Sequence, residues 1–195
     1  MPRPTERPIS LHGHEVRAIL NGTKTTLRRV IKGSLRSTCP FGGPGTRLWA
    51  RETWRPAMEA WSSYVEYEAG GRPLSVDRDR FDGLTAIALR FPGARKDIKS
   101  EAWHPSIHMP RWASRITLVN ELVLVERVKD ITEEGARAEG VPGYYHGGYK
   151  FDWRKMPPSV ANFRRLLEET SGAAAWDSNE WVRALTFYVG EVRLG

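Results

Sequence analysis

The stretch "RITLVNELVLVERV", residues 115–128, has the strongest strand pattern in the chain. Val and Leu recur through it, Ile116 and Thr117 begin it, and neither Gly nor Pro interrupts it. At roughly 3.3 Å per residue an extended segment of this length would span about 46 Å, which is long for one flat strand. We therefore expect it to bend around a barrel or to break near Asn120 and Glu121.

The rest of the sequence alternates short predicted elements with long loops. Apolar residues at helical spacing predict helices, and alternating or continuous apolar runs predict strands. The predicted strands are residues 9–11, 24–30, 47–54, 64–68, 86–91 and 181–192, and the predicted helices are residues 15–20, 132–139 and 159–170. This mixture predicts an α+β fold, a small mixed β-barrel with two or three short helices packed outside it.

Length and composition indicate one globular domain. The 195 residues suffice for a single domain with a hydrophobic core, and residues 55–100 contain too few apolar residues to form a core of their own. No run approaches the length of a membrane span, and the N-terminus has no apolar leader. With a single cysteine, Cys39, this predicts a cytoplasmic protein that does not bind membranes.

The positive charge is concentrated in the first third of the chain. Residues 1–60 contain 11 Lys and Arg but 4 Asp and Glu, whereas residues 61–195 contain 19 of each, so the whole net charge of +7 arises there. Clustered Lys and Arg neutralise phosphates and release counterions. The distribution predicts a nucleic acid or a nucleotide as the partner.

The segment "NGTKTTLRR", residues 21–29, lies in this basic region. If it is a strand, Lys24, Thr26 and Arg28 share one face, because side chains alternate. Such a face could bind phosphate, carry a catalytic Lys and Thr pair, or simply face water.

Two further segments interleave aromatic and basic residues, "RLWARETW" (47–54) and "WHPSIHMPRWASR" (103–115). Unpaired bases stack on aromatic rings, and arginine binds phosphates. The alternative for tryptophan is core packing, which we expect of Trp54, Trp176 and Trp181. The predicted nucleic-acid-binding residues are Lys24, Arg28, Arg47, Trp49, Arg51, Ser106, His108, Arg111, Trp112 and Arg115.

The histidines do not form a recognisable metal motif. His12 and His14 are separated by one residue, and the spacing of His104 and His108 suits a helix that the nearby prolines exclude. No phosphate-binding glycine loop or dinucleotide pattern occurs either. The sequence therefore predicts no metal and no cofactor.

Several of these blocks, in this order, resemble the ASCH domain, a relative of the PUA RNA-binding barrel. The blocks are "ILNGTKTTLRR", "CPFGGPGTRLWARETW", "WHPSIHMPRWASRI", "DITEEGARAEGV" and "WVRALTFYVGEV", and the likeness is to the branch carried by phages and prophages. The resemblance implies a single PUA-like domain over residues 1–195, with insertions at about 55–100 and 141–175. It also implies a basic, aromatic cleft that binds RNA or a modified nucleoside.

Some members of this family hydrolyse acetylcytidine, and ribonuclease activity is attributed to others. The resemblance to the amidohydrolases places their lysine at Lys24 and their glutamate at Glu139. Their threonine falls at Leu27 here, so Thr26 is the hydroxyl beside Lys24. The predicted catalytic residues are thus Lys24, Thr26 and Glu139.

Three alternatives remain open. The chain could bind its ligand without catalysis, or it could hydrolyse it. It could also be a phage accessory protein that binds a host protein through residues 55–100 or the "GYYHGGYKFDW" loop.

Overall fold

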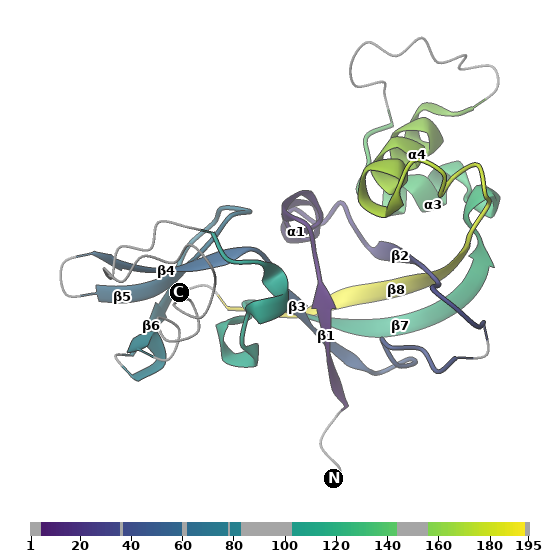
Figure 1. Cartoon of the computed structure of the whole chain (residues 1–195). Coiled ribbons are helices and arrows are strands. Elements are labelled where there is room, and N and C mark those ends of the chain that lie inside the picture. Colours follow the sequence, from purple (N-terminus) through teal and green to yellow (C-terminus); the bar gives the residue numbers. More distant parts are fainter. Residues whose placement is uncertain are drawn as a thin grey trace. The chain divides into compact units, whose positions relative to one another are not determined.

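The computed structural model of the 195-residue chain describes residues 5–35, 37–59, 62–77, 79–82, 103–143 and 156–193 (Figure 1). The predicted strand at residues 86–91 and most of the loop at 141–158 lie outside these ranges. No helix within them is both long enough and apolar enough to cross a membrane.

Within the described ranges eight strands form two sheets, and helices are few, so the predicted α+β class is confirmed. The five-stranded sheet has the order β1-β3-β7-β8-β2, and the three-stranded sheet has the order β4-β5-β6 (Figure 1). β1 pairs with β3 in parallel, and β2 pairs with β8 antiparallel. The strands are β1 (Glu6–Ser10), β2 (Thr26–Val30), β3 (Arg47–Arg51), β4 (Trp54–Glu59), β5 (Ser62–Tyr67), β6 (Leu74–Val76), β7 (Ile116–Arg127) and β8 (Trp181–Val192).

The chain divides into two compact units. The first unit comprises residues 1–17, 47–118 and 189–195, and the second comprises residues 18–46 and 119–188. Strands β7 and β8 each contribute residues to both units.

The helices follow the sequence patterns closely. Thr132 caps α3, because its hydroxyl accepts a hydrogen bond from the Gly135 N–H at 3.0 Å. The α-helices are α1 (Gly13–Leu20), α3 (Glu133–Ala138) and α4 (Pro158–Ser171), and the short 3-10 turns are η1 (Ser106–His108), η2 (Arg111–Ala113) and η3 (Val128–Asp130). The predictions of helices at 15–20, 132–139 and 159–170 are thereby confirmed.

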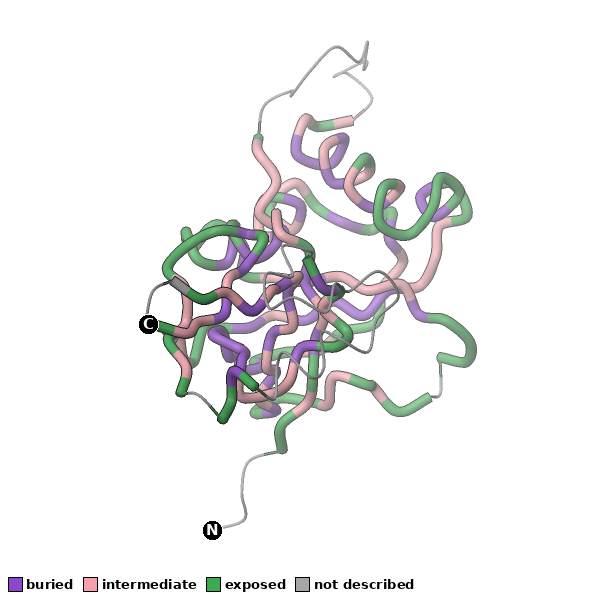
Figure 2. Tube along the Cα trace, turned by 60° about the vertical axis from the view of Figure 1, so that its left-hand side comes forward, coloured by how far each residue is buried: buried purple, intermediate pink, exposed green. Residues whose placement is uncertain are grey.

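The core of the second unit lies around α4. Figure 2 shows buried residues in purple along the chain. Val160, Phe163 and Leu167 recur at helical spacing and are buried, as expected of an amphipathic helix. They pack with Trp176, which confirms that this tryptophan belongs to the core. Trp181 was expected there too, but it is half-buried and the Arg127 guanidinium lies 4.1 Å from its ring centroid.

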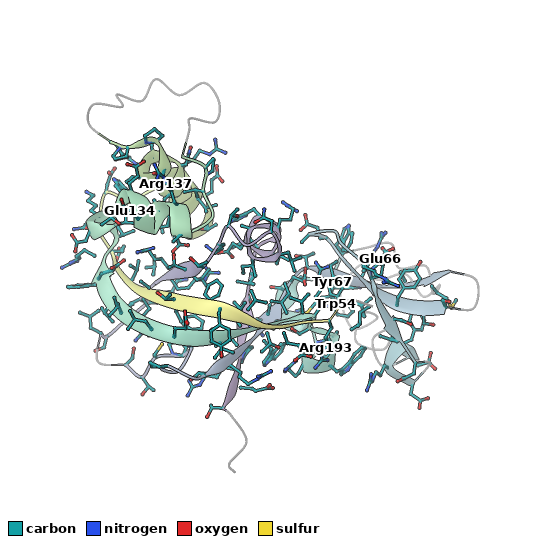
Figure 3. The ribbon with its side chains drawn as sticks, turned by 180° about the vertical axis from the view of Figure 1, so that it is seen from behind. Trp54, Glu66, Tyr67, Glu134, Arg137 and Arg193 are labelled. Atoms are coloured by element: carbon teal, nitrogen blue, oxygen red, sulfur yellow. The ribbon has the colours of Figure 1, made fainter. Side chains whose placement is uncertain are left out.

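The core of the first unit contains the three-stranded sheet. Trp54 on β4 pairs with Tyr67 on β5, and Figure 3 shows the two side by side. Both are buried and pack with Met109 and Ala113 from the segment that precedes β7. The β4–β6 strands therefore bury their apolar residues against another part of the chain, which explains how a segment poor in apolar residues is stable.

Strand β7 is continuous through Asn120 and Glu121, so the alternative of a break there is wrong. What changes at this point is burial, since residues 116–120 are buried and Glu121 is exposed. The Asn120 side-chain NH2 donates to the Phe41 carbonyl at 2.8 Å, so the nitrogen of this buried amide is satisfied, while its Oδ1 is buried without a hydrogen bond to any residue that the structure describes. The strand predicted at 47–54 instead divides at Glu52 into β3 and β4.

Candidate functional site

The backbone brings Lys24 against Glu139 in the second unit. After α1 ends, Gly22 turns the chain with a φ of 77°, and the Lys24 N–H donates to the Ala18 carbonyl at 3.0 Å. Lys24 then forms an isolated antiparallel bridge with Glu139, the residue that ends α3. The bridge holds two residues together that are 115 positions apart in sequence.

Gly140 permits this approach. Its φ is 81°, in the left-handed region that favours glycine. A Cβ at this position would lie 2.8 Å from the Ala18 Cβ and 3.0 Å from the Lys24 Cβ. A side chain would therefore force α3 away from Lys24.

The side chains of Lys24 and Glu139 form a buried ion pair. The Lys24 Nζ donates to the Glu139 Oε2 at 2.5 Å and to the Glu139 carbonyl oxygen at 3.0 Å. The two side chains are 0% and 3% exposed. Such a pair persists in an interior only if its hydrogen bonds replace the lost hydration.

Arg28 completes the cluster. Its Nη1 donates to the Glu139 Oε1 at 3.1 Å and to the Gly135 carbonyl at 3.3 Å, and its Nε donates to the Glu126 Oε1 at 2.7 Å. The Thr26 hydroxyl lies 3.5 Å from the Glu139 Oε1, a weak contact. The structure thus brings together all three predicted catalytic residues, and we call Lys24, Thr26, Arg28, Glu126 and Glu139 the Lys24 cluster.

Two cations face two carboxylates in the Lys24 cluster, so its formal charges balance. Its basic side chains are already bound and largely inaccessible, since Arg28 is only 8% exposed. Leu27 lies on the opposite face of β2 and is 1% exposed in the core. Position 27 therefore points away from Glu139, and Thr26 is the hydroxyl that reaches it.

In the first unit, the alternation of β3 buries Leu48 and Ala50 and leaves Arg47, Trp49 and Arg51 half-buried, as predicted. The Trp49 ring centroid lies 5.7 Å from the Arg51 guanidinium and 5.9 Å from that of Arg111. We call Arg47, Trp49, Arg51 and Arg111 the Trp49 surface.

Glu6 lies against the Trp49 surface. Arg111 donates to its carboxylate from Nε at 2.9 Å and from Nη2 at 3.0 Å, and Arg47 lies 3.4 Å from it. The hydrogen bond from Arg111 lowers the pKa of Glu6 below its ordinary value of 4.5. Arg47 also approaches Glu191 at 3.5 Å. These contacts orient the arginines but leave them accessible, since both are 30% exposed.

Arg115, predicted to contact nucleic acid, is instead buried. Its Nε and Nη2 donate to the two Glu52 carboxylate oxygens at 2.9 and 2.8 Å, and its guanidinium lies 4.1 Å from the Tyr67 ring centroid. Burial raises the pKa of Glu52 despite this pairing. Arg115 and Glu52 are only 3% and 1% exposed, so this arginine is committed to an internal partner.

The remaining predicted residues lie in the segment before β7. His108 is exposed and Ser106 is half-buried, both in η1. Trp112 is half-buried against the core around Trp54, with the Arg80 guanidinium 5.7 Å from its ring centroid. Burial lowers the pKa of the neighbouring His104, whose ring lies 5.2 Å from that of Trp54.

Sequence reasoning missed the carboxylates that bind these arginines. Glu6, Glu52 and Glu126 each pair with a residue predicted to contact nucleic acid. The one available signal was position, because Glu52 directly follows β3 and Glu126 is the residue before the last of β7. No group of three or more His, Cys, Asp or Glu residues suited to a metal ion occurs among the residues with described structure.

Comparison with known proteins adds little. No family model matches the chain. No protein of curated function matches it either. Among solved structures the chain is similar to protein EF3133 from Enterococcus faecalis V583, described by the family model DUF984, with 10% identity and a TM-score of 0.45 over 100% of this chain and 85% of that chain. A similarity this low supports no assignment, and the ASCH resemblance stays a prediction.

Proposed function

We propose that this chain is a PUA-like protein of the ASCH type that binds single-stranded RNA or a modified nucleoside at the Trp49 surface. The proposal includes the barrel, of which the five-stranded sheet would form the wall. The proposal rests on Trp49, which is half-buried on one face of the short strand β3. The centroid of its ring lies within 6 Å of two guanidinium groups.

The chemistry of this surface suits an unpaired nucleotide. A base can stack on the indole ring, while the flanking arginines bind phosphate or stack on the base themselves. Three arginines face two carboxylates, Glu6 and Glu191, and the exposed fraction of each carboxylate is near 40%. A phosphate can displace carboxylates that are this accessible, because surface ion pairs are weak.

The Lys24 cluster supports binding of RNA less well. Its two cations are held by two carboxylates and are shielded from solvent, so a phosphate would have to displace buried partners. We therefore assign RNA contact to the Trp49 surface and leave Lys24, Arg28 and Arg115 out of it.

Trp49→Ala tests the proposal, with affinity for a short unstructured RNA measured by fluorescence anisotropy. Losing one stacked base lowers affinity by about 1–3 kcal/mol, or roughly 5- to 150-fold. Trp181→Ala is the matched control, because it removes another half-buried tryptophan that an arginine stacks on. Equal affinity of wild type and Trp49→Ala would overturn the proposal.

Hydrolysis of an acylated cytidine is a second candidate, favoured by the Lys24–Glu139–Thr26 convergence. Glu139 would take a proton from water as the water adds to the acyl carbonyl carbon. The same proton would then pass to the leaving amine nitrogen as the C–N bond breaks, which yields the carboxylic acid and cytidine. The complete burial of the Lys24 side chain ranks this candidate below binding.

Incubation with acetylcytidine, followed by its ultraviolet absorbance, tests hydrolysis. Activity is expected to vanish in Glu139→Gln and to persist in Glu133→Gln, whose carboxylate lies on α3 outside the Lys24 cluster and pairs with Arg137. Thermal melting of both variants shows whether a loss of activity is a loss of folding. Absence of turnover by the wild-type chain excludes this candidate.

A further inference from the structure

A pocket with a volume of about 660 Å³ opens in the first unit where β1 leads into α1. Its lining includes His12, Gly13, Arg17, Glu68, Trp103 and Ser106, and none of its residues belongs to the Trp49 surface. The volume lies within the range of sites that bind small molecules, about 300–1,000 Å³.

Trp103 supplies an aromatic wall. Its side chain is 40% exposed, and the Arg55 guanidinium lies 4.6 Å from its ring centroid. Arg55 is itself held by Glu66, whose Oε2 accepts from its Nε at 2.6 Å. The tryptophan is therefore supported from one side by an ion-paired arginine and remains accessible, as a stacking platform requires.

Opposite charges meet beside Gly13. A Cβ at this glycine would lie 2.6 Å from the Glu68 Oε2 and 3.4 Å from the Arg17 Nη1. The Glu68 carboxylate thus lies where a side chain at position 13 would be, and the Arg17 guanidinium lies beside it, so an acceptor and a donor of hydrogen bonds are close together here. Both side chains belong to exposed residues and can meet a ligand from solvent.

The rings of His12 and His14 also lie at this pocket. They are parallel, with centroids 5.6 Å apart and an interplanar angle of 7°. A flat, polar lining of this kind favours a planar heteroaromatic ligand over a branched apolar one.

We propose that this pocket binds a purine nucleotide of the guanine type, with the base against Trp103. An ionised carboxylate only accepts hydrogen bonds and has two oxygens. Among the common bases guanine presents two adjacent N–H donors on one edge, so it complements Glu68 best, whereas uracil places acceptors on both sides of its single donor. Arg17 then binds the phosphate.

This site goes beyond the RNA-binding surface and does not depend on it. The two share no residue, and the ligand here is a single nucleotide. The two proposals can therefore fail separately. A mononucleotide that binds through Trp103 when RNA does not bind would support this site alone, and the reverse result would support the Trp49 surface alone.

Isothermal titration calorimetry of the full chain with GMP, CMP and UMP tests the site. We expect GMP to bind at least tenfold more tightly than UMP. Trp103→Ala and Glu68→Gln should each weaken GMP binding about fivefold or more, in line with the loss of one stacked base or one charged hydrogen bond. Arg165→Gln and Glu169→Gln, an exposed ion pair on α4, are the controls and should leave binding unchanged.

Gly13→Ala offers a variant that keeps the fold. The methyl group meets the mobile end of Glu68, and the glycine has no positive φ, so we expect normal melting and weakened GMP binding. Gly43→Ala adds the same methyl into open space and serves as its control. No GMP binding at millimolar concentration, equal binding of GMP and UMP, or binding unchanged by both Gly13→Ala and Trp103→Ala would overturn the proposal.

Discussion

Two sites, the Lys24 cluster in the second unit and the Trp49 surface in the first, hold their basic residues and glutamates in different environments. In the Lys24 cluster the charges are balanced and paired, Lys24 and Glu139 are buried, and Glu126 is partly exposed. On the Trp49 surface the same residue types are half-buried, and their carboxylate partners are largely open to solvent. A cation whose carboxylate partner is exposed can exchange that partner for a ligand, whereas a cation paired in the interior cannot do so without breaking a buried ion pair.

The largest expected difference is in stability. Lys24→Ala leaves Glu139 buried without its closest partner, and breaking a buried pair costs about 3–5 kcal/mol in the free energy of unfolding. Arg47→Ala removes only exposed contacts, which contribute about 1 kcal/mol or less. Urea denaturation measures both, and a loss below 1 kcal/mol for Lys24→Ala would contradict the buried role of the cluster.

A smaller effect isolates the close approach at Gly140. Gly140→Ala and Gly45→Ala both place a side chain at a positive φ, of 81° and 80°, which costs about 1–2 kcal/mol in each. Only Gly140 would also meet Ala18 and Lys24, which adds about 1–3 kcal/mol of overpacking. The test is the difference between the two unfolding free energies, and equal values would mean that α3 can move away from Lys24 without penalty.

The two kinds of carboxylate should respond oppositely to pH. Burial raises the pKa of Glu52, so the folded protein binds more protons there, and this group destabilises the fold increasingly as the pH rises above 4.5. The hydrogen bond from Arg111 lowers the pKa of Glu6, so its contribution to stability is present above pH 4.5 and is lost as the pH falls below that value. The measurement is the free energy of unfolding of Glu52→Gln and Glu6→Gln, each minus that of wild type, between about pH 3 and 7. Plotted against pH, the two differences should have slopes of opposite sign. Slopes of the same sign would mean that the two carboxylates do not differ in this way.

The smallest expected effect concerns the salt dependence of RNA binding. Arg51→Gln removes one charge of the Trp49 surface, and the slope of log affinity against log salt should shrink by about 0.7 for a single-stranded ligand. Arg165→Gln removes an exposed charge on α4 instead and should leave the slope unchanged. Equal slopes in both variants would mean that Arg51 does not meet a phosphate.

The sequence predicted local structure well where one pattern decides it. The helices predicted at 132–139 and 159–170 are confirmed, because the Thr132 cap and the apolar stripe of α4 both depend on neighbouring residues. The burial of alternate residues in β3 is local in the same way. Strand alternation also predicted that Lys24, Thr26 and Arg28 share one face, and all three side chains do contact the Glu139 carboxylate.

What the sequence could not predict depends on partners far along the chain. The sequence predicts that Arg115 and Trp49 both contact nucleic acid, because each belongs to a segment that mixes Arg with Trp. Only Arg115 proves to be bound by a buried carboxylate, that of Glu52, which is 63 residues away in sequence. The continuity of β7 has a similar cause. Its buried Asn120 donates a hydrogen bond from its side-chain NH2 to the Phe41 carbonyl, a partner 79 residues away that no local pattern indicates.

The most direct test of the central claim is the affinity of the full chain for a short single-stranded RNA, measured across a series of salt concentrations. If Arg47, Arg51 and Arg111 each neutralise one phosphate, log affinity should fall linearly with log salt with a slope of about −2. Trp49→Ala should shift that line to lower affinity without changing its slope. An affinity that does not vary with salt, or no binding at low salt, would contradict the account.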